Sequence, residues 1–202
     1  MLDFWHEFAS TYSFLTAVRI ETAAAEAGVA VAWRPFLLGP IFAAQGWRTS
    51  PFTLYPDKGA YMWRDVEREA ERLGYRLRPV ATFPQNGLLA ARVALVGSGG
   101  GWQSAFTKAV YLAEFCQARA IAEPAVLGEI LSDLGQDPRA VLEAAAAPEV
   151  KARLRAQTQR AQELRIFGAP SFVTGGGELF WGNDRLEQAL AWEAAGRRTA
   201  EA

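Results

Sequence analysis

Ser10 stands where an aromatic stretch gives way to a helical pattern, in HEFASTYSFL. Serine is a favoured helix N-cap because its side-chain oxygen accepts a hydrogen bond from a free backbone N–H of the first turn. The same helix end stabilises an anion, to which a nearby hydroxyl can donate a hydrogen bond. A thiolate is one such anion, and since this fragment has no cysteine, a ligand would have to bring it. Ser10 is therefore interpreted either as a cap or as a group that faces a ligand sulfur.

Three further fragments carry candidate binding groups. Ala169-Pro170 is either an ordinary strand start or a cis bond that exposes the Ala169 backbone to an extended, peptide-like ligand. In WGNDRL, Asn183 and Asp184 are either a helix cap with surface charge or side chains that face a ligand, with the carboxylate holding an ammonium group. Lys58 is either a solvated lysine or a partner for a ligand carboxylate.

The single histidine and the single cysteine limit the alternatives. His6 is the only candidate for the histidine of a hydrolase triad, but its place in the first predicted strand favours a structural role. Cys116 lies among apolar residues of a helical pattern, which favours core packing. One cysteine cannot form an intramolecular disulfide, and these counts argue against a zinc site.

The composition indicates a folded protein without a polyanion-binding surface. The chain has 202 residues, half of them apolar, and a formal net charge of -1 without charge blocks. We therefore expect no nucleic-acid or polybasic membrane surface. No window of about 18 apolar residues is present, and the start MLDFWHEF has no basic region before an apolar stretch. A cytoplasmic protein without a signal peptide or a membrane span is expected.

The first third of the chain predicts a βαβ unit and a long loop. Residues 2–8 and 29–35 have the composition of strands, and residues 11–28 between them follow helical spacing up to a glycine. A right-handed crossover between parallel strands is expected for this order. Residues 39–56 are rich in Gly, Pro and aromatics, which predicts a functional or partly helical loop.

The rest of the chain predicts helices and then a hairpin. Helical patterns continue to about residue 167, and three of them open at a proline, as expected for the first helical turn: Pro124, Pro138 and Pro148. Residues 169–173 and 178–182 then read as two strands joined by the turn TGGG. Asn183 or Asp184 is predicted to cap a final helix, and residues 196–202 to form a solvated tail.

The order β-α-β, helical block, β-β-α predicts an α/β protein with a thioredoxin-like fold and a large all-helical insertion. The predicted domains are a discontinuous thioredoxin-like domain, residues 1–38 and 166–202, and an inserted helical domain, residues 39–165. The prediction depends on the helical block lying between the two halves of an otherwise small mixed sheet.

Four fragments in this order, HEFASTYSFL, PDKGAYMWRD, FPQNGLLAAR and GAPSFV…ELFWGNDRLE, resemble the 2-hydroxychromene-2-carboxylate isomerase family. That family is related to kappa-class glutathione transferases and, more distantly, to the thiol oxidoreductases of bacterial disulfide formation. The resemblance covers about residues 2–195. It implies a glutathione-dependent isomerase that acts on an intermediate of aromatic-compound catabolism.

The resemblance also implies roles for the candidate residues. Ser10 matches the serine that hydrogen-bonds the glutathione sulfur and stabilises its thiolate. Ala169 and Pro170 match the residue and cis-proline whose backbone pairs with the cysteinyl part, and Asn183 and Asp184 match the pair that binds the γ-glutamyl end. Glutathione would then be a cofactor that is regenerated in each turnover. The partner would be a small aromatic electrophile, and the assembly a homodimer.

Lys58 matches a lysine near the tripeptide in the kappa-class enzymes. Two departures concern the remaining contacts: Thr11 follows Ser10 where the family has proline, and QGWRTSP stands where kappa-class members have an asparagine loop. A kappa-class-like glutathione transferase or peroxidase is therefore the alternative. A second alternative is a peptide- or thiol-binding protein of the disulfide-oxidoreductase type without redox cysteines, because thiol exchange needs a protein thiolate and no Cys-x-x-Cys is present.

Overall fold

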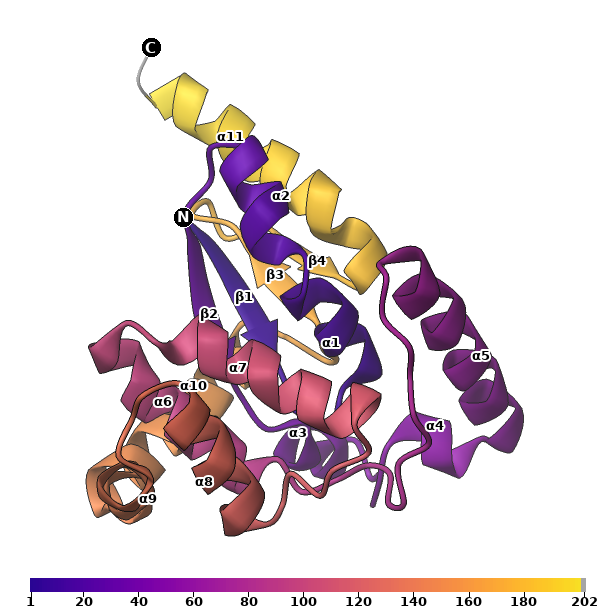
Figure 1. Ribbon diagram of the computed structural model, residues 1–202. Helices are drawn as coiled ribbons and strands as arrows, with labels where there is room; N and C mark the ends of the chain where they lie inside the picture. The colour runs from indigo at the N-terminus through magenta and orange to yellow at the C-terminus, as the bar shows by residue number, and fades with distance from the viewer. Residues whose placement is uncertain (201–202) are drawn as a thin grey trace.

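Four strands form one mixed sheet in the order β2-β1-β3-β4 in the computed structural model (Figure 1). The central strand β1 (Leu2–His6) runs parallel to β2 (Val31–Pro35) and antiparallel to β3 (Ser171–Val173). At the edge, β4 (Leu179–Trp181) pairs antiparallel with β3. Strands from the two ends of the chain therefore share one sheet, as the predicted fold class requires.

Helices join and cover the strands, and the backbone of residues 1–200 and the side chains of residues 1–196 are described. In chain order they are α1 Thr11–Ala17, α2 Ile20–Glu26, α3 Leu38–Ala44, α4 Pro51–Leu54, α5 Pro56–Arg72, α6 Leu88–Gly100, α7 Gln103–Tyr111, the π-helical turn η1 Leu112–Cys116, α8 Pro124–Asp133, α9 Pro138–Ala146, α10 Pro148–Glu163, the 3-10 turn η2 Asn183–Arg185 and α11 Leu186–Ala200. No helix of the described part is long and apolar enough to cross a membrane.

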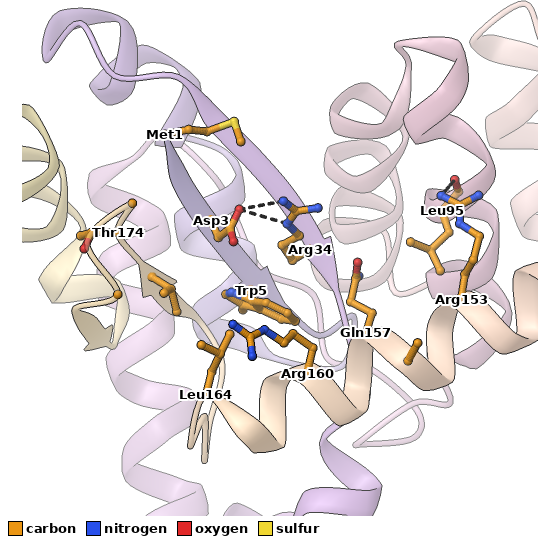
Figure 2. Close-up of a pocket in the computed structure, with 14 residues that line it drawn as sticks. Met1, Asp3, Trp5, Arg34, Leu95, Arg153, Gln157, Arg160, Leu164 and Thr174 are labelled. Carbon is orange, nitrogen blue, oxygen red and sulfur yellow. Dashed lines mark hydrogen bonds and ion pairs between the residues drawn. The ribbon is translucent and has the colours of Figure 1, made fainter. Parts of the chain in front are cut away.

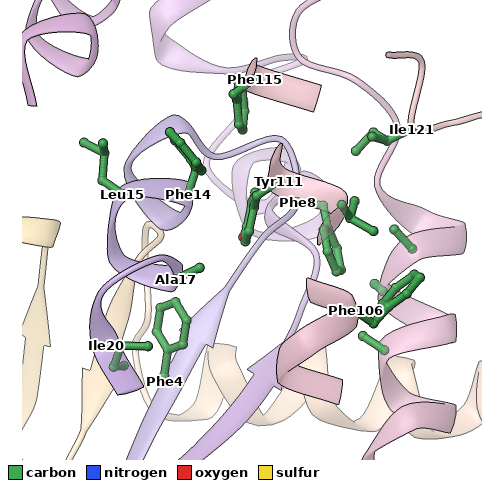
Figure 3. Packing of buried hydrophobic residues seen from close by; sticks show 14 of the residues in the cluster. Phe4, Phe8, Phe14, Leu15, Ala17, Ile20, Phe106, Tyr111, Phe115 and Ile121 are labelled. Atoms are coloured by element: carbon green, nitrogen blue, oxygen red, sulfur yellow. The ribbon is translucent and has the colours of Figure 1, made fainter. Parts of the chain in front are cut away.

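The two faces of the sheet pack against different helices because successive side chains of a strand point to opposite sides. Leu2 and Phe4 enter the main core together with residues of α1, α6, α7 and α11. Trp5 points the other way, into a smaller core with Ala161 of α10 and Ile41 of α3. Figure 3 shows the main core, in which the rings of Phe8, Phe14, Tyr111 and Phe115 gather beside the end of β1. The end of β1 is therefore held on both sides.

Residues 38–163 lie between β2 and β3 and contain α3 to α10, which confirms the thioredoxin-like fold with a helical insertion. The main core takes side chains from both the sheet and these helices. The division into domains of residues 1–38 with 166–202 and of residues 39–165 stays a prediction.

Two local predictions are corrected and one is confirmed. The helix expected over residues 11–28 is two helices that meet at Arg19, whose side chain donates to Asn183 and pairs with Glu187 across the fold. The segment of residues 39–56, predicted to be a functional or partly helical loop, is partly helical: it holds most of α3 and all of α4. The backbone of residues 196–200 continues α11 instead of forming a tail, and residues 201–202 lie outside the described residues.

Candidate active site

A cleft of about 1560 Å³ opens where β1 ends, α1 begins and β3 starts. Its lining includes every residue that was predicted to bind or act, namely Ser10, Lys58, Ala169, Pro170, Asn183 and Asp184. These residues come from four separate parts of the chain, and the fold brings them to one place. Their common location makes this cleft the candidate site, while their roles stay predictions.

Ser10 is the N-cap of α1 and also contacts Ala169. Its backbone is extended, and its Oγ accepts a hydrogen bond from Ser13 N at 3.1 Å, which is the expected cap. The same hydroxyl donates to the carbonyl of Ala169 at 2.9 Å. The cap and the ligand-facing interpretation are thus compatible, since one lone pair serves the helix and the proton points toward the cleft-lining residue Ala169.

The Ala169-Pro170 peptide bond is cis, as the resemblance implies. The carbonyl of Pro170 accepts a hydrogen bond from Gly182 N at 3.0 Å, which joins this corner to the end of β4. Gly168, just before it, lies under the ring of Trp181: a Cβ at position 168 would come within 2.4 Å of Trp181 Nε1. This corner of the cleft is therefore shaped by close backbone packing.

Asn183 is buried, with 7% of its surface exposed, and its side-chain oxygen is already in use. Its Oδ1 accepts from Thr16 Oγ1 and from Arg19 Nε, both at 3.1 Å. The cap of the final helix by Asn183 or Asp184 stays a prediction, while the 3-10 turn η2 before that helix has Gly182 as its N-cap, without a side-chain capping bond. Asn183 links η2 to α1, so its remaining amide donor is the group that could meet a ligand.

Lys58 and Asp184 lie at the rim of the cleft with their charges toward solvent. The Lys58 Nζ is 5.5 Å from the centre of the Tyr55 ring, and Lys58 has no ion-pair partner within the described part of the chain. The Asp184 side chain is 74% exposed, and its Oδ2 lies 3.4 Å from Nη1 of Arg185. The rim thus offers an ammonium group and a carboxylate to a ligand that carries both charges.

Aromatic side chains cover part of the cleft. The rings of Phe42 and Trp47 lie 5.7 Å apart, and those of Tyr12 and Phe52 lie 6.3 Å apart. The Tyr12 hydroxyl donates to Asp65 at 2.9 Å, and burial together with Asp65 raises the pKa of this phenol above its ordinary value. Residues 39–56, expected to be functional, supply much of this apolar wall. A flat aromatic molecule fits such a lining.

Glu7 also lines the cleft, and the sequence interpretation missed it. One carboxylate oxygen, Oε2, accepts from Ala9 N at 2.9 Å. Burial raises the pKa of Glu7 to about 7, and the bond from Ala9 opposes this rise. The signal in the sequence is a carboxylate three residues before Ser10, but its unusual acidity depends on burial that a sequence does not display.

His6 is fully buried beneath the cleft and does not line it. Its Nδ1 lies 3.4 Å from the Tyr111 hydroxyl, and its Nε2 has no hydrogen-bond partner within the described part of the chain. Burial lowers the pKa of His6 to about 3, so the ring is neutral at physiological pH. Cys116 is partly buried in η1, and burial raises the pKa of its thiol. These positions favour structural roles for both residues.

A second hollow of about 780 Å³ lies on the far face of the sheet, beside α10 (Figure 2). It contains Arg34, Arg153 and Arg160, and two of these are neutralised: Arg34 pairs with Asp3 at 3.0 Å and Arg160 with Glu163 at 3.2 Å. Arg153 donates to backbone and hydroxyl oxygens. None of the predicted site residues lines this hollow, so the cleft at Ser10 remains the candidate.

In this cleft the start of α1 at Ser10 meets the cis-proline Pro170. The sequence profile of the DSBA-like thioredoxin domain matches residues 1–191. The chain belongs to this family.

Similar proteins are 2-hydroxychromene-2-carboxylate isomerases, in agreement with the resemblance in the sequence. The isomerase of Sphingobium xenophagum is 28% identical, over 92% of this chain and 94% of that protein. The isomerase of Pseudomonas putida is 26% identical, over 92% and 90%. A solved 2-hydroxychromene-2-carboxylate isomerase superposes with a TM-score of 0.82 at 25% identity, covering 99% of this chain and 96% of that one.

Proposed function

We propose that this protein is a glutathione-dependent isomerase of the 2-hydroxychromene-2-carboxylate isomerase type. The observation that carries the proposal is the hydrogen bond from Ser10 Oγ to the Ala169 carbonyl inside the cleft. It joins a hydroxyl at a helix start to a backbone acceptor beside Pro170, in a chain whose lone cysteine is elsewhere. Such a site suits a thiol that arrives with a peptide-like ligand.

The charges of the cleft fit the tripeptide. Glutathione carries a thiol, an ammonium group and two carboxylates. In our proposal the Ser10 hydroxyl faces the sulfur, Asp184 holds the γ-glutamyl ammonium group with Asn183 beside it, and Lys58 holds a carboxylate. The support is their common place in one cleft and the absence of an ion-pair partner for Lys58 in the described part.

Ser10 and Ala169 would exchange partners on binding. In the free protein the hydroxyl proton is held by the Ala169 carbonyl. When the ligand binds, the hydroxyl would turn to the sulfur and the carbonyl would accept the cysteinyl N–H. Each bond that breaks is replaced, and the new bond to a charged sulfur is the stronger kind. The exchange therefore favours the thiolate.

The energy required is moderate. Lowering a thiol pKa of about 8.5 by two units takes about 2.7 kcal/mol. A helix N-terminus supplies about 0.3–1 kcal/mol, and a hydrogen bond to a charged group about 1.5–3 kcal/mol. Because α1 has only seven residues, we assign the larger share to the Ser10 hydroxyl.

When bound, glutathione supplies a nucleophile that adds to the substrate reversibly, so that a ring can open and a bond can rotate before the thiol leaves. The chain itself would bind and orient: the aromatic wall of Phe42, Trp47 and Phe52 would hold a flat substrate next to Ser10. These rings also exclude water from the reacting atoms. The substrate in this proposal is a small aromatic electrophile.

Calorimetry with glutathione tests the proposal. We expect heat of binding for the native protein at millimolar glutathione and a clear loss of affinity in Asp184→Ala. An isomerase also leaves the glutathione concentration unchanged during turnover, whereas a transferase consumes it. The absence of any heat with the native protein would refute glutathione dependence.

A further inference from the structure

A buried carboxylic acid lies beneath the cleft without an obvious structural use. Glu114, in the π-helical turn η1, is 0% exposed, and neither of its carboxylate oxygens has a hydrogen-bond partner within the described part of the chain. Its neighbours in sequence, Tyr111 and Phe115, belong to the aromatic core (Figure 3). Buried polar groups in native proteins normally have partners, so such an exception points to function.

Glu7 connects this buried region to the cleft. The Tyr111 hydroxyl donates to the Glu7 carbonyl at 2.8 Å, and the same carbonyl accepts from Ser10 N at 3.0 Å. The Glu7 side chain lines the cleft together with Ser10. The tight turn between Glu7 and Ser10 therefore fixes both side chains at the place where the thiol is proposed to bind.

One oxygen of Glu7 is held and the other is available. Oε2 accepts from Ala9 N, while Oε1 has no hydrogen-bond partner in the described residues. Oε1 faces Gly87: a Cβ at that position would lie 3.3 Å from Oε1 and 2.8 Å from the Cβ of Phe8. The glycine lets the chain pass close to the carboxylate without covering it with a side chain. The free oxygen can thus take up a proton.

The titratable groups packed around Glu7 add no positive charge to it. From η1 and α7 these are Glu114 and Tyr111, and from β1 the neutral His6; residues 83–88 bring no charged side chain. Burial raises the pKa of Glu7 to about 7. Burial and then Glu7 raise the pKa of Glu114 well above its ordinary value, so this acid holds its proton more firmly than an exposed carboxylic acid does. Glu7, unlike Glu114, lines the cleft, so it is the carboxylic acid that a ligand can reach.

We propose that Glu7 accepts the proton that a ligand thiol gives up when it binds at Ser10. The S–H bond breaks, an O–H bond forms at Oε1, and the electron pair stays on the sulfur, which receives a hydrogen bond from the Ser10 hydroxyl. The proton returns when the ligand leaves as a thiol, so no oxidant or reductant is involved. The Glu7 carboxylate and the ligand thiolate would be two adjacent negative charges that repel each other. This repulsion keeps one proton on either the carboxylate or the sulfur. The inference rests on the proposed function and deepens it.

The number of protons released to solvent on glutathione binding shows whether the thiol proton stays on Glu7 or leaves the protein. At pH 8 a group with a pKa of about 7 is about nine-tenths ionised, so Glu7 is ready to accept the proton. Calorimetry at pH 8 in two buffers of different ionisation enthalpy gives the protons released for each glutathione bound. Absorbance near 240 nm gives the amount of thiolate.

We expect the native protein to form thiolate while releasing far less than one proton for each thiolate. In Glu7→Gln, either about one proton is released for each thiolate formed, or the amount of thiolate falls severalfold at the same pH. Glu69→Gln is the matched control, because Glu69 lines the same cleft but pairs with Arg72 at its rim, and it should keep the native proton count. Glu7→Asp, which keeps the charge and shortens the side chain, is the second variant to be measured if Glu7→Gln does not fold.

Two results would contradict these proposals. If the native protein and Glu7→Gln both release one proton for each thiolate, the proton goes to solvent and Glu7 has no part in it. If neither protein gives heat with glutathione, the proposed function itself fails. The two failures are therefore separate observations in one experiment.

Discussion

At the scale of single residues, a mutation of Ser10 tests its proposed contact with the ligand sulfur apart from its helix cap. We predict that Ser10→Ala raises the pKa of the bound thiol and lowers turnover, while much of the glutathione affinity remains. The reason is that, among the atoms of the ligand, the sulfur alone is expected to contact the Ser10 hydroxyl. The charged ends of the ligand are expected to bind to other residues of the cleft. Titration of the absorbance near 240 nm against pH measures the effect.

Ser10→Ala also removes the N-cap of α1, so a control variant must separate the loss of stability from the loss of thiol acidity. Because Ser10 Oγ accepts from Ser13 N, Ser10→Ala also costs about 1 kcal/mol of folding free energy. Ser10→Asp restores a capping oxygen but places a negative charge beside the sulfur, so it should recover stability without recovering thiol acidity. A thiol titration that Ser10→Ala leaves unchanged would remove Ser10 from the mechanism.

Lys58 is predicted to affect binding and not acidity. Lys58→Ala should weaken glutathione binding severalfold, since an exposed ion pair contributes up to about 1 kcal/mol. The bound thiol should titrate as in the native protein, because Lys58 lies at the rim above Tyr55. Lys58→Arg keeps the charge and is the control. Equal affinity in Lys58→Ala would show that this lysine is merely solvated.

At the scale of elements, Gly182 fixes the turn that carries Asn183 and Asp184. Its φ of 115° lies in a region that other residues rarely adopt, and a Cβ there would come within 2.5 Å of Asp184 Oδ1. We predict that Gly182→Ala lowers the free energy of unfolding by about 1–3 kcal/mol and weakens glutathione binding. Denaturant unfolding and calorimetry measure the two effects.

Gly99→Ala is the matched control for this substitution. Gly99 lies in α6 with no atom within 4 Å of an added Cβ, so alanine should raise stability by up to about 1 kcal/mol. If Gly182→Ala behaves like Gly99→Ala, the turn tolerates a side chain and Asp184 is not held by it.

The same scale shows which elements local patterns predict. Pro124, Pro138 and Pro148 each begin a helix, as predicted, because a proline fits the first turn and nowhere else in a helix. The break at Arg19 was not predictable, since it accompanies contacts with Asn183 and Glu187, more than 160 residues away. Local pattern finds an element, and distant contacts decide where it ends.

The candidate site divides in the same way. Ser10 and the Ala169-Pro170 corner were found because short fragments in a fixed order resemble a known family. Glu7 was missed because the rise in its pKa comes from burial, which depends on the packing of the whole fold and is not visible in the local sequence. Asn183 was found, but its hydrogen bond from Thr16 on α1 was not, since that partner lies more than 160 residues away along the chain.

At the scale of the whole molecule, buried ionisable groups make stability depend on pH in opposite directions. His6 has its pKa lowered to about 3 in the fold, so the unfolded chain binds a proton more readily below the unfolded pKa of 6.5 and stability falls as pH decreases from 6.5 toward 3. Glu7, with its pKa raised to about 7, gives the reverse: the folded chain keeps a proton, and stability rises as pH decreases from 7 toward 4.5.

The contribution of His6 can be isolated by difference. His6→Phe keeps an aromatic ring among Phe4, Phe8 and Trp33 but removes the titration. We predict that the variant gains about 2–3 kcal/mol relative to the native protein between pH 7.5 and pH 4.5, since each pKa unit corresponds to about 1.4 kcal/mol. Urea unfolding across this range measures both proteins, and the carboxylate contributions cancel because both share them. Parallel stability curves would mean that His6 becomes protonated inside the fold or is reached by water, contrary to its burial between β1 and Tyr111.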